Sequence, residues 1–194
     1  MNSIENYEFV SELKNKILNT VISVVPNYPK TEISNEVLFN FSDGSQLLIS
    51  SDYADVETPF HNAEDDSVLE ISETINHEPF CNIEDFELSS IQVNEPVLSV
   101  DLVIDEASLP KDVNSTCRYL VAVFIRTQNH QFNIWKDLMT GFYLHGDFHF
   151  ENTDGLYKPE ERWDDYDFPI HVRRIKYSLF DKTECVIADK IVNS

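Results

Sequence analysis

The chain has 194 residues, of which 42% are hydrophobic and 12% aromatic, and its formal net charge is −21. This composition excludes an acidic disordered chain, because such chains are poor in aromatic and β-branched residues. The four glycines are scattered, which excludes a nucleotide-binding loop built on clustered glycines. The negative charge also argues against a nucleic-acid-binding surface. We expect one domain spanning residues 1–194.

The negative charge is concentrated in one part of the chain. No lysine or arginine occurs between Lys30 and Lys111, whereas residues 31–110 hold nineteen Asp and Glu. Ordinary solvated surfaces mix both signs, so the repulsion in this stretch needs an offset. The candidates are cations, a basic partner, or the basic residues of the C-terminal half across the fold. We expect the negative field on one side of the molecule, centred on a loop from Asp52 to Asp66.

The first predicted element is an α-helix over residues 4–21. Apolar side chains recur there at spacings of three and four, which is typical of an amphipathic helix. We expect its apolar stripe to pack on the core. Pro26 and Pro29 then mark a turn.

The rest of the chain reads mainly as strands. Residues 37–41 and 47–51 flank Asp43-Gly44, a strong hairpin signal because both residues tolerate positive φ. Residues 119–125 are continuously apolar and predict a central strand that is buried on both faces. The further strand candidates are residues 68–75, 86–93, 98–105, 142–150, 170–179 and 184–192.

One helix followed by about eight strands predicts an α+β fold. In this fold the N-terminal helix packs on a mainly antiparallel β-sheet. The alternative is a β-sandwich with one helix. A parallel α/β fold is disfavoured because strands and helices do not alternate.

The segment 143–151 holds the residues closest to a metal-binding pattern. On a strand, His145, Asp147, His149 and Glu151 share one face. Imidazoles and carboxylates on one face suit a divalent cation, but alternating polar and apolar residues are also ordinary for an antiparallel strand. We therefore expect no cofactor, with a divalent metal as the alternative.

Arg173, Arg174 and Lys176 form the one basic cluster of the chain. In so acidic a protein we expect these residues to pair with carboxylates inside the molecule. The three cysteines form no Cys-x-x-Cys pattern, and no apolar run reaches the roughly 20 residues of a membrane span. These features predict a cytoplasmic protein that does not enter a membrane.

The charge pattern favours a small acidic binding module that docks on a cationic protein. In size and charge the chain is similar to bacterial toxin-immunity proteins, which inhibit partners such as nuclease toxins, although no motif carries this likeness. Tyr53 and Phe60 are candidate aromatic anchors. The candidate partner-binding residues are Asp52, Tyr53, Asp55, Glu57, Phe60, Glu64, Asp65 and Asp66.

The alternative function is a metal-binding β-domain or metalloenzyme that uses the face of His145, Asp147 and His149. The sequence favours a non-enzyme over an enzyme. It leaves the oligomeric state open.

Overall fold

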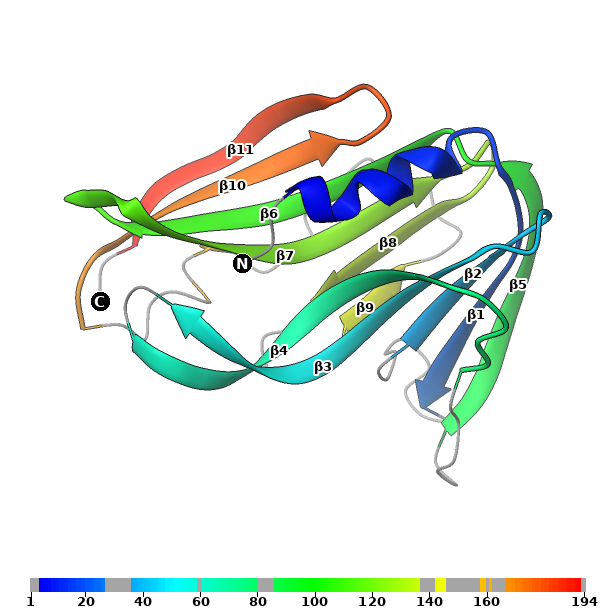
Figure 1. Ribbon diagram of the computed structural model, residues 1–194, viewed down its shortest axis with the longest axis horizontal. Helices are drawn as coiled ribbons and strands as arrows, with labels where there is room; N and C mark the ends of the chain where they lie inside the picture. The colour runs from blue at the N-terminus through cyan, green and yellow to red at the C-terminus, as the bar shows by residue number, and fades with distance from the viewer. Residues whose placement is uncertain are drawn as a thin grey trace.

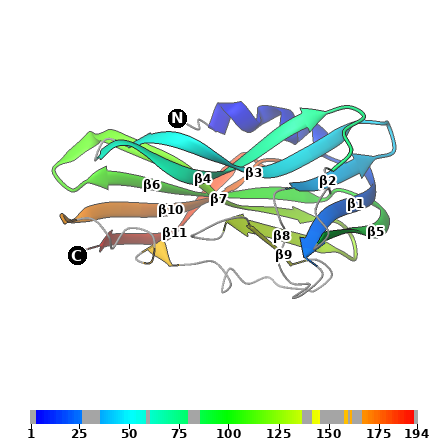
Figure 2. The same ribbon diagram turned by 90° about the horizontal axis from the view of Figure 1, so that it is seen from below.

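The computed structural model describes residues 4–26, 36–58, 61–79, 86–136, 142–145, 158–159, 161 and 167–192. Within these ranges the chain forms two antiparallel β-sheets that lie as two layers (Figures 1 and 2). Sheet A has the strand order β4-β3-β2-β1-β5, and sheet B has the order β11-β10-β6-β7-β8-β9.

In the described ranges the fold consists mainly of eleven strands, preceded by a short helical element. A 3₁₀-helix, η1, spans Ile4–Leu13. The strands of sheet A are β1 (Ile17–Pro26), β2 (Glu36–Phe41), β3 (Gln46–Thr58), β4 (His61–Thr74) and β5 (Phe86–Pro96). The strands of sheet B are β6 (Ser99–Leu109), β7 (Asp112–Arg126), β8 (Gln131–Lys136), β9 (Phe142–His145), β10 (Ile170–Ser178) and β11 (Thr183–Val192).

The predicted α+β fold is wrong, because the described residues are almost entirely β. The predicted α-helix over residues 4–21 is absent, and so is the α-helix that the alternative sandwich included. Residues 4–13 of the predicted helix form the 3₁₀-helix η1, and residues 17–21 lie in β1. No helix in the described ranges has the length and apolar composition needed to cross a membrane.

A β-bulge explains why the sequence of β1 resembled a helix. Leu18 and Val21 are three residues apart, as on a helix face, and both are buried in the core. The register of β1 shifts between Leu18 and Thr20, so one extra residue moves Val21 back to the inner face. The segment is rich in β-branched residues, which favour strands over helices.

The hairpin predicted around Asp43-Gly44 is confirmed. β2 pairs with β3 from Glu36↔Ser50 to Asn40↔Gln46, and Gly44 has a φ of +85°. The buried central strand is also confirmed, since Val121, Ala122 and Val123 of β7 have no exposed surface. The segment Asp52–Asp66, expected to be a loop, instead forms paired strands of β3 and β4.

The chain crosses from sheet A to sheet B between β5 and β6. Val97, which is fully buried, donates its N–H to the carbonyl of Lys16 and accepts a hydrogen bond from the N–H of Asn15. The next residue, Leu98, donates its N–H to the carbonyl of Arg126 at the end of β7. Val97 is thus bonded to the residues directly before β1 of sheet A, and Leu98 is bonded to β7 of sheet B. These bonds join the two layers at this corner.

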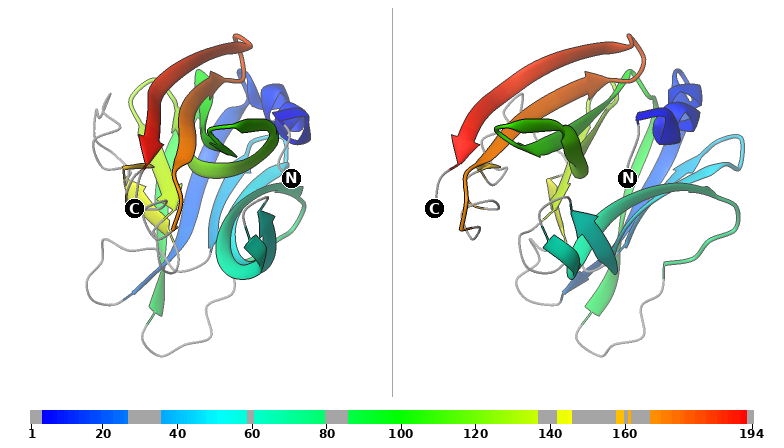
Figure 3. Two further views of the ribbon diagram at one scale, coloured as in Figure 1. Left: turned by 90° about the vertical axis from the view of Figure 1, so that its left-hand side faces the viewer. Right: turned by 60° about the vertical axis from the view of Figure 1, so that its left-hand side comes forward.

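The main hydrophobic core lies between the two sheets. Phe39 of β2 and Phe132 of β8 have no exposed surface, and their rings meet edge to face with centroids 5.7 Å apart. Tyr7, Val10 and Leu13 of η1 belong to the same cluster. A 3₁₀-helix has three residues per turn, so these three side chains lie on one side of it. η1 thus adds to the core at the side of the two layers (Figure 3).

Truncation of the aromatic pair should loosen the contact between the sheets. We expect Phe39→Ala and Phe132→Ala each to lower the free energy of unfolding by about 3–5 kcal/mol, because each leaves a cavity in a fully buried core. The double variant should lose less than the sum by about 0.5–1.5 kcal/mol, the ring–ring contribution. Chemical denaturation measures all three variants.

Leu88→Ala, at a residue that is 53% exposed, is the control and should change stability by less than about 0.5 kcal/mol. Strict additivity would show that the rings do not couple the sheets.

Candidate functional site

The two sheets differ sharply in charge. The five strands of sheet A contain eleven Asp and Glu and no Lys or Arg. The six strands of sheet B contain six acidic and seven basic residues. The basic-free stretch of the sequence therefore corresponds mainly to one layer of the molecule, and the expectation of a one-sided negative charge agrees with this division of the strands.

The far half of the β3–β4 hairpin extends beyond the rest of sheet A. β2 pairs only with residues 46–50 of β3, whereas β3 and β4 continue to pair as far as Thr58↔His61. Figure 1 shows the two strands running on to the left, away from β1, β2 and β5. Residues 51–58 and 61–68 thus form a two-stranded extension, which we call the acidic arm.

The acidic arm holds the predicted partner-binding residues in ordered strands. β3 carries Asp52, Tyr53, Asp55 and Glu57, and β4 carries Glu64, Asp65 and Asp66. The eighth candidate, Phe60, lies outside the described residues.

The backbone register brings acidic positions together in the arm. Asp55 lies opposite Asp65, and Asp66 lies opposite Ala54. Like charges directly opposite each other on neighbouring strands are destabilising. The arm therefore places acidic positions close together on neighbouring strands.

In sheet B the acids of β6 are paired with basic residues of the neighbouring strands. Arg174 of β10 lies opposite Asp105 of β6, and both side chains are buried. The guanidinium donates from Nε to Oδ1 at 2.6 Å and from Nη2 to Oδ2 at 2.8 Å, a bidentate ion pair. Asp105 of β6 is thus enclosed within the protein together with its counter-ion.

Three further ion pairs join the remaining acids of β6 to β7 and β10. Glu106 of β6 pairs with Arg118 of β7 and with Arg173 of β10. Lys176 lies 2.8 Å from an Asp101 carboxylate oxygen. The prediction that the basic cluster pairs with carboxylates inside the molecule is confirmed for all three of its residues.

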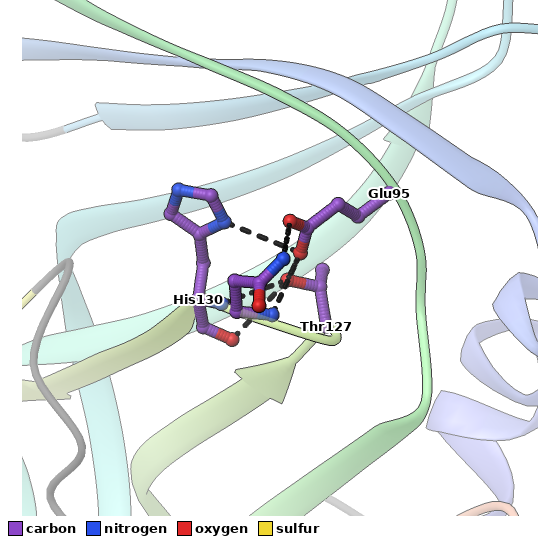
Figure 4. Close-up of polar contacts among 4 residues, drawn as sticks. Glu95, Thr127 and His130 are labelled. Atoms are coloured by element: carbon purple, nitrogen blue, oxygen red, sulfur yellow. Dashed lines mark hydrogen bonds and ion pairs between the residues drawn. The ribbon is translucent and has the colours of Figure 1, made fainter.

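A second polar cluster, which was not predicted, lies at the corner where the sheets meet (Figure 4). The Glu95 carboxylate of β5 accepts hydrogen bonds from Thr127 Oγ1 at 2.6 Å, from the Asn129 N–H at 2.9 Å and from Asn129 Nδ2 at 2.6 Å. His130 Nδ1 lies 3.3 Å from the same carboxylate. Burial alone raises the pKa of Glu95, but the hydrogen bonds from Thr127, Asn129 and His130 outweigh it and lower the pKa to about 2.

A hydroxyl, an imidazole and a carboxylate also make up catalytic triads, but the bonding here is different. In a triad the hydroxyl gives its proton to the imidazole and the carboxylate orients the imidazole. Here Thr127 Oγ1 donates directly to Glu95 and accepts from the backbone N–H of His130. Thr127 is also only 2% exposed. The cluster therefore fastens the β7–β8 turn to β5 and offers no activated nucleophile.

The sequence signal for this cluster lay in the turn itself. The polar run from Thr127 to His130 separates two apolar segments, a pattern that predicts a turn between strands. Recognising it would have identified β8, which the sequence analysis missed. The contact with Glu95, more than thirty residues away, has no local signature.

The proposed metal ligands are not brought together by the described residues. His145 lies at the end of β9, opposite the buried Asn133 of β8. Asp147, His149 and Glu151 lie outside the described residues. Among the part of the chain that the structure describes, no group of three or more His, Cys, Asp or Glu has the geometry to hold a metal ion.

The fold defines a two-sheet antiparallel β protein with an acidic arm on one layer. Comparison with models of known families, with curated proteins and with solved structures found no match to the chain.

The Glu95 cluster should make part of the stability depend on pH. Its folded pKa of about 2 lies below the ordinary value of 4.5, so its contribution is present above about pH 4.5 and is lost as the pH falls toward 2. We expect Glu95→Gln to lower the free energy of unfolding by about 1–2 kcal/mol at pH 7. Denaturation at pH 7 and pH 3 should show a smaller difference from wild type at the lower pH. Glu78→Gln, at an exposed residue outside the cluster, is the control. An equal deficit at both pH values would contradict an ionised Glu95.

Removal of one partner from the buried ion pair should be more damaging than removal of both. Asp105→Asn leaves the Arg174 guanidinium buried without its counter-ion, and we expect a loss of about 3–5 kcal/mol. Asp105→Leu combined with Arg174→Met replaces the pair by apolar groups and should recover most of that loss. Thermal and chemical denaturation measure both variants. If the double variant is less stable than the single one, the pair stabilises the fold by itself.

Proposed function

We propose that this protein is a small acidic binding module that docks its acidic arm on a cationic partner protein. The partner class that suits this charge is a basic enzyme such as a nuclease toxin, which an immunity-type inhibitor blocks. The observation that carries the proposal is the division of charge between the sheets. Eleven acids without a single Lys or Arg occupy the strands of sheet A, whereas acids and bases are balanced in the strands of sheet B.

The contrast within the molecule supports this interpretation. In sheet B the fold places basic residues opposite its acids, as with Arg174 and Asp105. In the acidic arm the register places Asp55 opposite Asp65. A cationic surface bound to the arm would relieve this repulsion, and complementary fields would speed association and reject acidic partners.

Charge supplies rate and selectivity, but a tight complex also needs a buried anchor. Hot spots at interfaces are enriched in tyrosine, tryptophan and arginine. Tyr53 lies in β3 among the acidic positions, so we propose it as the anchor of the arm. We further propose a reducing, cytoplasmic setting, which the free, exposed thiol of Cys185 supports.

The test is inhibition of a panel of purified basic nucleases, with binding measured at about 50 and 300 mM salt. Wild-type protein should inhibit a member of the panel, and its affinity should fall about tenfold or more at the higher salt because exposed charges are screened. The arm variant D55N/E64Q/D65N should bind at least about tenfold more weakly than wild type at low salt.

A matched variant separates the arm from net charge. E12Q/D167N/D181N also removes three negative charges, all of them outside sheet A, and should bind within about threefold of wild type. Equal weakening by both triple variants would assign the effect to net charge alone. Salt-insensitive binding, or no inhibition of any nuclease in the panel, would contradict the proposal.

A further inference from the structure

A cavity of about 310 Å³ lies between η1 and the β10–β11 hairpin. It is separate from the acidic arm, since its walls come from η1 and sheet B. Its volume is at the lower end of the range for small-molecule sites, which is roughly 300–1,000 Å³. The lining residues are Ser11, Tyr177, Ser178, Leu179, Lys182, Thr183 and Glu184.

The lining combines both signs of charge with hydroxyl groups and an apolar wall. Lys182 and Glu184 are two residues apart, and within the described part of the chain neither forms an ion pair. This differs from β6 and β10, where opposite charges are joined. Lys14 brings a second ammonium group to the same corner, with its Nζ 5.8 Å from the ring centroid of Phe180. Leu179 and the Tyr177 ring supply apolar surface.

The backbone at Lys182 is unusual for its residue type. Its φ is +51°, in the left-handed region that favours glycine and asparagine. The other described residues with positive φ are Gly44 and three asparagines, Asn15, Asn76 and Asn94. Lys182 is the last residue of the loop 179–182, which joins the paired residues Ser178 and Thr183. A left-handed residue is ordinary in such a hairpin loop, and it is the position of Lys182 in the lining that makes its side chain a candidate for a binding role.

The Tyr177 hydroxyl is kept as a hydrogen-bond donor. Burial, with the nearby negative charges of Glu106 and Glu184, raises the pKa of Tyr177, although Arg118 and Arg173 act in the opposite direction. A phenol is protonated at neutral pH even at its ordinary pKa of 10.0, so the Tyr177 hydroxyl can donate to an anionic group.

We propose that this cavity binds a small zwitterion with an apolar side group, of the α-amino acid class. Its ammonium group meets Glu184, its carboxylate meets Lys182 and the hydroxyl donors, and its side group lies against Leu179 and the Tyr177 ring. A simple anion would face the Glu184 carboxylate, and a simple cation would face Lys182. Only a ligand that carries both charges complements both. The site is independent of the function proposed for the acidic arm.

The probes are L-leucine, L-phenylalanine and L-methionine, titrated into the full-length ¹⁵N-labelled protein. We expect saturable shifts in the backbone amides of Ser178, Lys182 and Thr183 with at least one probe, at a Kd on the order of 1 mM or tighter. For leucine, 4-methylpentanoate lacks the ammonium group and 3-methylbutylamine lacks the carboxylate. The corresponding analogues of the binding amino acid should each bind at least about tenfold more weakly. The proposal is overturned by an absence of saturable shifts with all three probes, or by equal binding of the analogues.

Two variants assign the charges without disturbing the fold. Lys182→Asn keeps a residue that tolerates positive φ, so the melting temperature should not fall, while affinity for the amino acid should drop about tenfold or more. Glu184→Gln should weaken binding of the amino acid but not of the analogue that lacks the ammonium group. Lys111→Gln, in the exposed turn between β6 and β7, removes one positive charge elsewhere and should leave the affinity unchanged. Unchanged affinity in Lys182→Asn would overturn the proposed site.

Discussion

The passage of the chain through Val97 is the constraint on which the rest of the structure depends. Its two backbone hydrogen bonds join it to Asn15 and Lys16 at the start of sheet A, while Leu98 bonds to Arg126 in sheet B. No side chain is needed for this bridge, but the buried environment demands that these backbone groups be paired. The Glu95 cluster secures the same corner, because it fastens the β7–β8 turn to the last strand of sheet A.

This single crossing explains how a linear charge pattern becomes a spatial one. The chain completes sheet A with β1 to β5 before it begins sheet B with β6. The basic-free stretch of residues 31–110 therefore supplies β2 to β5 of sheet A and overlaps sheet B only at β6. The acids of β6 then lie between β7 and β10, which carry Arg118, Arg173 and Arg174. A fold that interleaved the two halves within one sheet would have mixed the charges throughout.

The sequence allowed the strands to be recognised where alternation or turn chemistry was clear, as at Asp43-Gly44 and in β7. It misled where a local irregularity imitated another pattern, since the bulge in β1 places Leu18 and Val21 at helical spacing on one face. The sequence also does not show the register in which the strands pair. The basic cluster was expected to pair with carboxylates, but that Asp105 is the partner of Arg174 depends on strand order across nearly seventy residues. The Glu95 cluster was missed for the same reason.

The geometry of the acidic arm bears on how the proposed cationic partner would bind. A two-stranded ribbon is marginally stable by itself in water, and like charges on opposite strands weaken it further. The arm is anchored at its base, because the adjoining residues Leu47 and Ile49 of β3 and Leu69 of β4 are buried in the core. Binding to a cationic surface would neutralise the arm. Such charge complementarity favours fast, salt-dependent association over extreme affinity unless an anchor such as Tyr53 is buried in the proposed complex.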